Sequence, residues 1–302
     1  MNTQKHFYAL FLLLFAYASI HGEIRKVTSI NQALGVLNKA NTHTLVVTDI
    51  DQVLLEPCNT LIKYARYYDA PPGHNPYTEL EAYIKQKSLS NPYYVQQFWS
   101  AVWKQIPVTC IETITPSIIR DLQKRNIKII ALTAPPIKEP FALNDISKKR
   151  REQLLSLCID FSKSFGSTYI EFKNLKPLYG IYPTFDHGVI YQASMGGTTK
   201  GQVLAAFLDA INWRPKQIIF FDDTLYNLES VEKEMKKRSI PCICFWYQAP
   251  YKPSASTERI AQAQLEYFKK YGILLRDREA QELFEKEAKN VSIKNIFQHM
   301  FA

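Results

Sequence analysis

The strongest constraint on the fold is a repeated alternation of amphipathic segments and short apolar runs. Four apolar runs of strand length each follow a segment with helical spacing of apolar residues, and they cover residues 45–48, 128–132, 217–221 and 242–246. Runs that are apolar on both faces and separated by amphipathic helices indicate a parallel sheet with helices on both sides. We therefore expect an α/β, Rossmann-like core.

Two regions interrupt this alternation and set the expected domain boundaries. Residues 58–110 are rich in Tyr, Asn and Pro and contain helical pieces such as "YVQQFWSAVWKQ", which indicates a helical insertion after the first strand. Between Phe172 and Met195 the pattern predicts a β-hairpin or short strand pair. The tail from Thr257 is polar and helical and is expected to pack on the core. The core is therefore assigned to residues 23–57 and 111–302.

The N-terminal residues 1–22 have the layout of a secretory signal peptide. One lysine precedes an apolar run from Phe7 to about Ala18, and small residues follow it. The run is short for a membrane span, although an uncleaved anchor is the alternative. No later segment is apolar for long enough to cross a bilayer. We expect an exported protein, periplasmic or secreted, without a stable membrane span after cleavage.

Net charge and cysteine content say little about which ligands or partner molecules the protein binds. A formal net charge of +9 favours anionic partners, such as phosphorylated substrates or anionic surfaces. The run "KKRR" at Lys148 to Arg151 is interpreted as a solvated helix face, and no nucleic-acid partner is expected. The five cysteines resemble neither a disulfide framework nor a zinc site. Cys242 and Cys244 are expected to be small core residues that point to opposite faces of a strand.

Polar residues stand where the expected strands end. In open α/β sheets, ligands bind outside the carboxyl ends of the strands, so these residues are expected to meet in one pocket. Buried carboxylates are costly without a compensating cation, which indicates a chemical role for those in this set. The residues are Asp49, Asp51, Thr133, Lys200, Asp222 and Asp223.

Four motifs in order resemble those of the haloacid-dehalogenase-like phosphohydrolases. They are "DIDQVL", the Thr133 of "IIALTA", the Lys200 of "GGTTKG", and "FFDDTLYN". The resemblance runs from about residue 45 to 246, and the tail is similar to a bacterial family of this superfamily whose function is unknown. It implies a haloacid-dehalogenase-like parallel sheet, with residues 58–110 as a helical cap that selects the substrate.

The resemblance also implies roles for the aspartates. Asp49 would attack phosphorus and form an aspartyl-phosphate, while Asp51 would protonate the leaving oxygen and then activate water. A Mg²⁺ ion would be held by Asp49, the backbone carbonyl of Asp51, and Asp223. Asp222 and Asn227 would be secondary groups of the metal site, although Asp222 and Asp223 could instead be helix N-cap groups.

Lys200 and Thr133 complete the implied site. Lys200 would neutralise the nucleophile and the phosphate, and Thr133 would donate a hydrogen bond to a phosphate oxygen. The chain departs from the usual motifs at three positions: Gln52 replaces a common Gly, Val53 replaces a common Thr, and Asn227 replaces an acid. An asparagine can still bind metal through its amide oxygen.

The function expected from these residues is an exported, Mg²⁺-dependent phosphatase that hydrolyses phosphate monoesters of small molecules. Two alternatives stay open. The chain could be a non-catalytic binding protein that keeps the fold, or a phosphotransferase whose acceptor is not water.

Overall fold

The computed structural model describes residues 23–139, 145–193 and 197–286. The chain forms two compact units. The α/β unit contains the residues up to Leu55 and those from Cys110 to Ala249, and the helical unit contains Glu56 to Thr109 and the residues from Pro250 onward. The signal peptide expected at residues 1–22 lies outside the described residues.

An eight-stranded sheet forms the centre of the α/β unit, in the order β1-β10-β9-β2-β5-β8-β7-β6. The first six strands in this order, from β1 to β8, each run parallel to their neighbours. The last two pairings, β8 with β7 and β7 with β6, are antiparallel. The strands are β1 (Glu23–Val27), β2 (Thr44–Thr48), β5 (Lys128–Thr133), β6 (Tyr169–Glu171), β7 (Thr184–Asp186), β8 (Val189–Tyr191), β9 (Gln217–Asp222) and β10 (Cys242–Tyr247).

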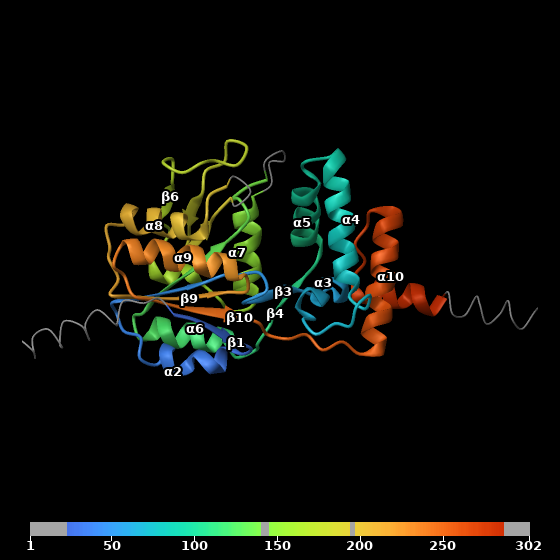
Figure 1. The fold of residues 1–302 in the computed structure, drawn as a ribbon, viewed down its shortest axis with the longest axis horizontal. Coiled ribbons are helices and arrows are strands. Elements are labelled where there is room, and N and C mark those ends of the chain that lie inside the picture. The colour runs from blue at the N-terminus through green and yellow to red at the C-terminus, as the bar shows by residue number, and fades with distance from the viewer. Residues whose placement is uncertain (1–22, 140–144, 194–196, 287–302) are drawn as a thin grey trace, which may run out of the picture. The chain divides into compact units, whose positions relative to one another are not determined.

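Helices cover both faces of this sheet. Figure 1 shows α2 and α6 on one face and α8 and α9 on the other. Leu45 and Val47 of β2 pack with Val203 of α8 and Leu228 of α9 in one buried cluster, and alternate residues such as Val46 point to the other face. The helices of the unit are η1 (Ile30–Ala33), α2 (Leu34–Leu37), α6 (Thr115–Lys124), α7 (Ile146–Ser156), η3 (Phe161–Ser164), α8 (Lys200–Ala210) and α9 (Leu225–Lys237).

The α/β architecture with a mostly parallel sheet is therefore confirmed. The expected strand pair is β7 and β8, joined at His187 and Gly188, whose φ angles of 47° and 85° form a left-handed turn. Strand β1 was not predicted. Its sequence "EIRKV" buries only its last residue, because β1 lies at the edge of the sheet, where charged residues are common.

Cys242 and Cys244 are core residues, as expected. The expectation that they point to opposite faces of the strand was wrong. Residues two positions apart on a strand point to the same face. Both side chains are buried on β10, and their sulfur atoms lie 3.5 Å apart as free thiols.

The helical unit combines the expected insertion with part of the tail. Its core contains Leu61 and Phe98 from the insertion together with Leu265 and Phe268 from α10. The tail was expected to pack on the α/β core, and α10 differs, since it packs against α3 and α4. The elements are β3 (Leu55–Pro57), α3 (Thr60–Lys63), η2 (Tyr64–Arg66), α4 (Pro76–Ser90), α5 (Tyr94–Gln105), β4 (Val108–Cys110) and α10 (Ala255–Tyr271).

Polar contacts fix α10 and the segment that follows it within the helical unit. The buried Gln264 accepts a hydrogen bond from the Leu61 backbone N–H at 2.9 Å, and Asn59 donates to the Leu275 carbonyl at 2.9 Å. The chain passes between the units within β3, within β4 and after Ala249. None of the helices in the described ranges is both long and apolar enough to span a membrane.

Candidate active site

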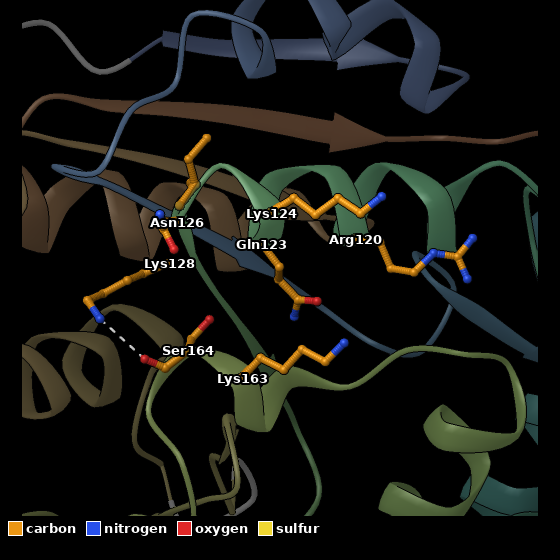
Figure 2. A pocket seen from close by; sticks show the side chains of 8 residues that line it. Arg120, Gln123, Lys124, Asn126, Lys128, Lys163 and Ser164 are labelled. Atoms are coloured by element: carbon orange, nitrogen blue, oxygen red, sulfur yellow. Dashed lines mark hydrogen bonds between the residues drawn. The ribbon is translucent and has the colours of Figure 1, made fainter.

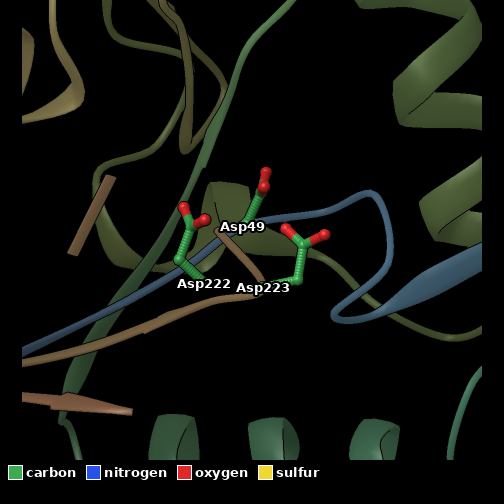
Figure 3. Close-up of side chains that lie close together, drawn as sticks. All are labelled: Asp49, Asp222 and Asp223. Carbon is green, nitrogen blue, oxygen red and sulfur yellow. The ribbon is translucent and has the colours of Figure 1, made fainter. Parts of the chain in front are cut away.

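Three carboxylates meet at the carboxyl ends of two neighbouring strands. Asp49 directly follows β2, Asp222 ends β9, and Asp223 comes next. The backbone N–H of Asp49 donates to the Phe221 carbonyl at 2.8 Å, which joins the two strand ends. Carboxylate oxygens of the three aspartates lie within 4.8 Å of one another. Figure 3 shows the three side chains side by side. We call these three residues the acidic cluster.

Lys200 is the cation of this cluster. Its side chain is fully buried, and its Nζ lies 2.7 Å from Asp222 Oδ2 and 2.8 Å from Asp49 Oδ2. Burial alone would lower the pKa of this ammonium, but the charges of Asp222 and Asp49 outweigh burial and raise it. Lys200 is therefore a permanent positive charge in contact with Asp49.

The sequence around Lys200 explains its position. Thr199 and Gln202 form a capping box that starts α8 at Lys200. The next residue, Gly201, lies so close to α9 that an added Cβ would come within 2.1 Å of the Ser230 carbonyl oxygen. A glycine here lets α8 approach α9 and brings Lys200 to the strand ends.

Asp222 acts as an internal anchor in this arrangement. Its Oδ2 accepts from Lys200, and its Oδ1 accepts from the Thr224 backbone N–H and from Asn227 Nδ2, both at 2.9 Å. Asp222 thus holds both Lys200 and the chain just before α9. The N-cap residue of α9 is Thr224, so the alternative that Asp222 or Asp223 is the N-cap was wrong. Asn227 contacts Asp222 through its amide nitrogen.

The pKa values of the other two acids are raised. Burial raises the pKa of Asp49 well above its usual range, with further contributions from Asp222 and Asp223, against the lowering effect of Lys200. Burial, followed by the charge of Asp222, raises the pKa of Asp223 to about 7. Both carboxylates are therefore costly to ionise in the absence of a cation.

The formal charges show what would compensate this cost. Three ionised carboxylates and one ammonium give a net charge of −2 (three negative, one positive). Clustered carboxylate oxygens are the donors that hard divalent cations such as Mg²⁺ prefer. The acidic cluster therefore has the donor type and the charge that fit one such ion.

Asp51 has a separate cation. Nη2 of Arg150 lies 2.8 Å from both carboxylate oxygens of Asp51, and Nη1 donates to Gln153 Oε1 at 3.0 Å. Thr133 Oγ1, at the end of β5, is 3.4 Å from Asp51 Oδ2. The two aspartates of the first motif are thus held by different cations, Asp49 by Lys200 and Asp51 by Arg150.

Arg150 was missed at the sequence level, because the run "KKRR" was interpreted as solvated. That interpretation was wrong for this residue: its side chain is only 1% exposed, whereas Lys148 and Arg151 are exposed. Residues Ile146, Arg150 and Leu154 are spaced by four and are all buried, so they share one face of α7. This apolar spacing around Arg150 was the available signal.

The loop after β2 explains one departure from the usual motif. Gln52 has a φ of 62°, a left-handed conformation that glycine adopts without strain. The turn is closed by the Ile50 carbonyl, which accepts from the N–H groups of Leu54 and Leu55 at 2.9 Å each. Gln52 therefore keeps the backbone conformation that favours glycine at this position.

Comparisons with known proteins give a family without an assigned function. A family model described as "Protein of unknown function (DUF2608)" matches residues 26–281. An uncharacterized protein of Rickettsia bellii is 25% identical over 260 residues, which cover 81% of this chain and 82% of that protein.

Two chlamydial proteins are similar at the same level. A protein of Chlamydia trachomatis named "Putative outer membrane protein" is 26% identical over 270 residues, covering 87% of this chain and 92% of that protein. A protein of Chlamydia muridarum with the same name is 24% identical over 247 residues, covering 82% and 85%. No solved structure matches the chain.

Proposed function

We propose that this chain, which belongs to the DUF2608 family of unknown function, is an exported, Mg²⁺-dependent phosphatase. It would hydrolyse phosphate monoesters of small molecules through an aspartyl-phosphate. The observation that carries the proposal is the contact of Asp49 with the buried Lys200 beside the acidic cluster, which together with Lys200 has a formal charge of −2. A phosphoryl group placed there would meet a nucleophile and fixed positive charge together, as phosphoryl transfer requires.

Asp49 is oriented as a nucleophile in this proposal. Its Oδ1 accepts from the Ile50 backbone N–H at 2.7 Å, and its Oδ2 contacts Lys200 at 2.8 Å. These contacts fix the plane of the carboxylate, so attack on phosphorus requires little reorganisation. Lys200 reduces the repulsion between the carboxylate and an incoming phosphate.

Asp49, Asp223 and the backbone carbonyl of Asp51 would hold Mg²⁺. The bound ion would supply positive charge for the phosphate oxygens. Asp222 is not a necessary ligand here, because its two oxygens already hold Lys200 and the start of α9. Asn227 would support the site through Asp222.

Asp51 would act as proton donor and then as base, with Arg150 as a positioning residue. The guanidinium fixes the carboxylate by contacts to both oxygens. A protonated Asp51 gives up this ion pair, and a bound phosphate is an anion that can accept hydrogen bonds from Arg150 in its place. Thr133, beside Asp51, would donate to a phosphate oxygen.

The resemblance to haloacid-dehalogenase-like enzymes supports the same chemistry, with residues 58–110 as a substrate-selecting cap. Export is supported by the signal-like residues 1–22 and by the outer-membrane names of the chlamydial relatives. The final compartment would be the periplasm or the exterior of the cell.

One observation favours a second candidate function, a binding protein that keeps the fold without turnover. The ion pair of Asp51 with Arg150 occupies the carboxylate that catalysis needs as a proton donor. Such a protein would still bind Mg²⁺ and phosphate. Transfer to an acceptor other than water is separated from hydrolysis by analysing the products with added alcohols.

The test is hydrolysis of a generic aryl phosphate by the chain from Glu23 onward, with Mg²⁺ and with chelator. We expect metal-dependent turnover that Asp49→Asn lowers on the order of 10⁴-fold or more, since a nucleophile acts as part of a unit. Asp209→Asn, which removes an exposed carboxylate of α8, is the matched control and should keep full activity. Absence of turnover across a broad panel of phosphoesters would contradict the proposal.

A further inference from the structure

A second polar hollow lies at the opposite end of the sheet from the acidic cluster. Its volume is about 360 Å³, and Figure 2 shows α6 on one side and residues 163–164 on the other. Its cations are Arg120, Lys124, Lys128 and Lys163, and Gln123 and Ser164 also line it. We call this site the basic hollow.

The charge of the basic hollow is not compensated by the protein. No carboxylate lines it, and none of its four cations forms an ion pair with the described part of the chain. The neighbouring Arg125 differs, since it contacts Asp121 and donates to the Ala40 carbonyl at 2.7 Å. Like charges that share a hollow repel one another and raise the local affinity for anions.

Helix electrostatics explain only part of this pattern. Lys124 lies in the last turn of α6 and Lys163 in the last turn of η3, where a cation is favourable. Arg120 lies in the turn before, and Lys128 begins β5. The gathering of all four cations around one hollow therefore needs a further reason.

Two residues that line the basic hollow are held by hydrogen bonds within the protein. Lys128 Nζ donates to the Ser164 carbonyl at 3.2 Å and lies 4.5 Å from the centre of the Phe165 ring. Gln123 Nε2 donates to the Asp160 carbonyl at 2.7 Å. By contrast, Arg120, Lys124 and Lys163 are exposed. The site thus combines a fixed cation with three cations that are free to contact a ligand.

The basic hollow is separate from the candidate active site. Lys128 begins β5 and Thr133 ends it, so the two sites lie about 16 Å apart at about 3.3 Å per residue. The volume of 360 Å³ is in the range of small-molecule pockets, about 300–1,000 Å³. Seven of its eight lining residues have polar or charged side chains, which favours a charged ligand.

We propose that the basic hollow binds a ligand with at least two phosphate groups. A single phosphate carries at most about two negative charges, so four cations match two phosphates better than one. The shared chemistry is a di- or triphosphate group, or a headgroup with two phosphates on a lipid. The proposal does not depend on the phosphatase function, because it uses none of its residues.

Calorimetric titration of the chain from Glu23 onward with inorganic tripolyphosphate, in chelator, tests the proposal. We expect Lys124→Gln/Lys163→Gln to bind at least tenfold more weakly than the wild type. The matched control is Lys233→Gln/Lys236→Gln, which removes two exposed lysines of α9, on the other face of the sheet, and should bind within twofold of the wild type. Orthophosphate should bind at least tenfold more weakly than tripolyphosphate.

A second arm identifies the source of the phosphates. The same proteins are sedimented with phosphatidylcholine vesicles, with or without phosphatidylinositol bisphosphate. Tripolyphosphate binding that depends on Lys124 and Lys163 supports a free ligand, and vesicle binding with the same dependence supports a lipid headgroup. Loss of affinity in the control pair equal to that in the hollow pair, or no dependence on Lys124 and Lys163 in either arm, would overturn the proposal. Each result is independent of whether aryl phosphate is hydrolysed.

Discussion

The two ends of strand β5 lie beside positive charges in opposite environments. Near its carboxyl end, Lys200 and Arg150 are buried and each contacts carboxylates at 2.7–2.8 Å. Near its amino end, Lys124 and Lys163 are exposed and form no ion pair with the described chain. Desolvated, compensated cations are fixed parts of the protein, whereas exposed, uncompensated cations are available to a ligand. Both ends use only lysine and arginine, so the two groups of cations differ in burial and in their partners.

The largest expected effect comes from removing a cation at the carboxyl end of β5, compared with removing one at the amino end. Lys200→Met leaves Asp49 and Asp222 buried without their partner, so we expect the free energy of unfolding to fall by about 3–5 kcal/mol in chelator. The measurement is urea denaturation. Lys124→Met, the matched change at the exposed end, should alter it by less than about 0.5 kcal/mol. Equal effects of the two changes would break the comparison.

Arg150 and Arg151 provide a sharper test, because they are adjacent on α7 and differ in burial. Arg150→Met should lower kcat/KM for aryl phosphate about 10- to 100-fold, the usual effect of removing a group that orients a functional side chain. It should also change the pH profile, since Asp51 loses its partner. Arg151→Met should leave both unchanged. Loss of activity with an unaltered pH profile would indicate a structural role only.

Metal binding at the acidic cluster, near the carboxyl end of β5, should depend on pH. Without metal, the pKa of Asp223 is raised to about 7 from 3.8, so the folded state holds a proton that the unfolded state releases, and stability falls as pH rises from about 4 through 7. In the proposed site, Mg²⁺ would replace that proton. Its affinity should therefore fall about tenfold, or about 1.4 kcal/mol, per pH unit below 7.

Thermal melting with and without Mg²⁺ at pH 6 and pH 8 measures this dependence. The increase in Tm on adding Mg²⁺ should be larger at pH 8. Asp223→Asn should abolish most of the increase at both values, and Asp209→Asn should keep it. An increase of equal size at both pH values would show that Asp223 does not exchange its proton for the metal.

The smallest expected effect is at the exposed end. Lys124→Gln/Lys163→Gln removes half of the uncompensated charge but also two cations at helix ends. Relief of repulsion, offset in part by the loss of this helix-end effect, should raise the free energy of unfolding by at most about 0.5 kcal/mol at low salt. The gain should vanish in about 1 M salt, where charges beyond about 3 Å are screened. Chemical denaturation at the two salt concentrations checks this. A loss of stability at low salt would mean that the favourable helix-end effect outweighs the repulsion between the cations.

The sequence predicted the α/β core and the gathering of polar residues at strand ends, because apolar periodicity and parallel topology determine both. The structure brings Asp49, Lys200, Asp222 and Asp223 together as expected. Asp222 and Asn227 were expected to support the metal site. In the structure Asn227 donates to Asp222, and Asp222 holds Lys200 and the start of α9.

Arg150 could not be found from charge alone, because a basic run is normally solvated. Only its spacing from Ile146 and Leu154 on α7 indicates burial. The sequence also could not predict which unit α10 packs in. Amphipathic spacing shows that a helix packs against another element, but it does not say which core that element belongs to. The contacts that place α10 are with residues such as Leu61 and Phe98, far away in the sequence.

These distant contacts also set an order of events in folding. Asn59 bonds to Leu275, 216 positions away, and Leu61 bonds to Gln264, 203 positions away. At a synthesis rate of about 5–20 residues per second, roughly 10–40 s pass between the synthesis of Leu61 and that of Gln264 in α10. During that interval Leu61 and Phe98 lack their α10 partners and are exposed to proteases and chaperones. The helical unit can therefore close only after Leu275 has been synthesised.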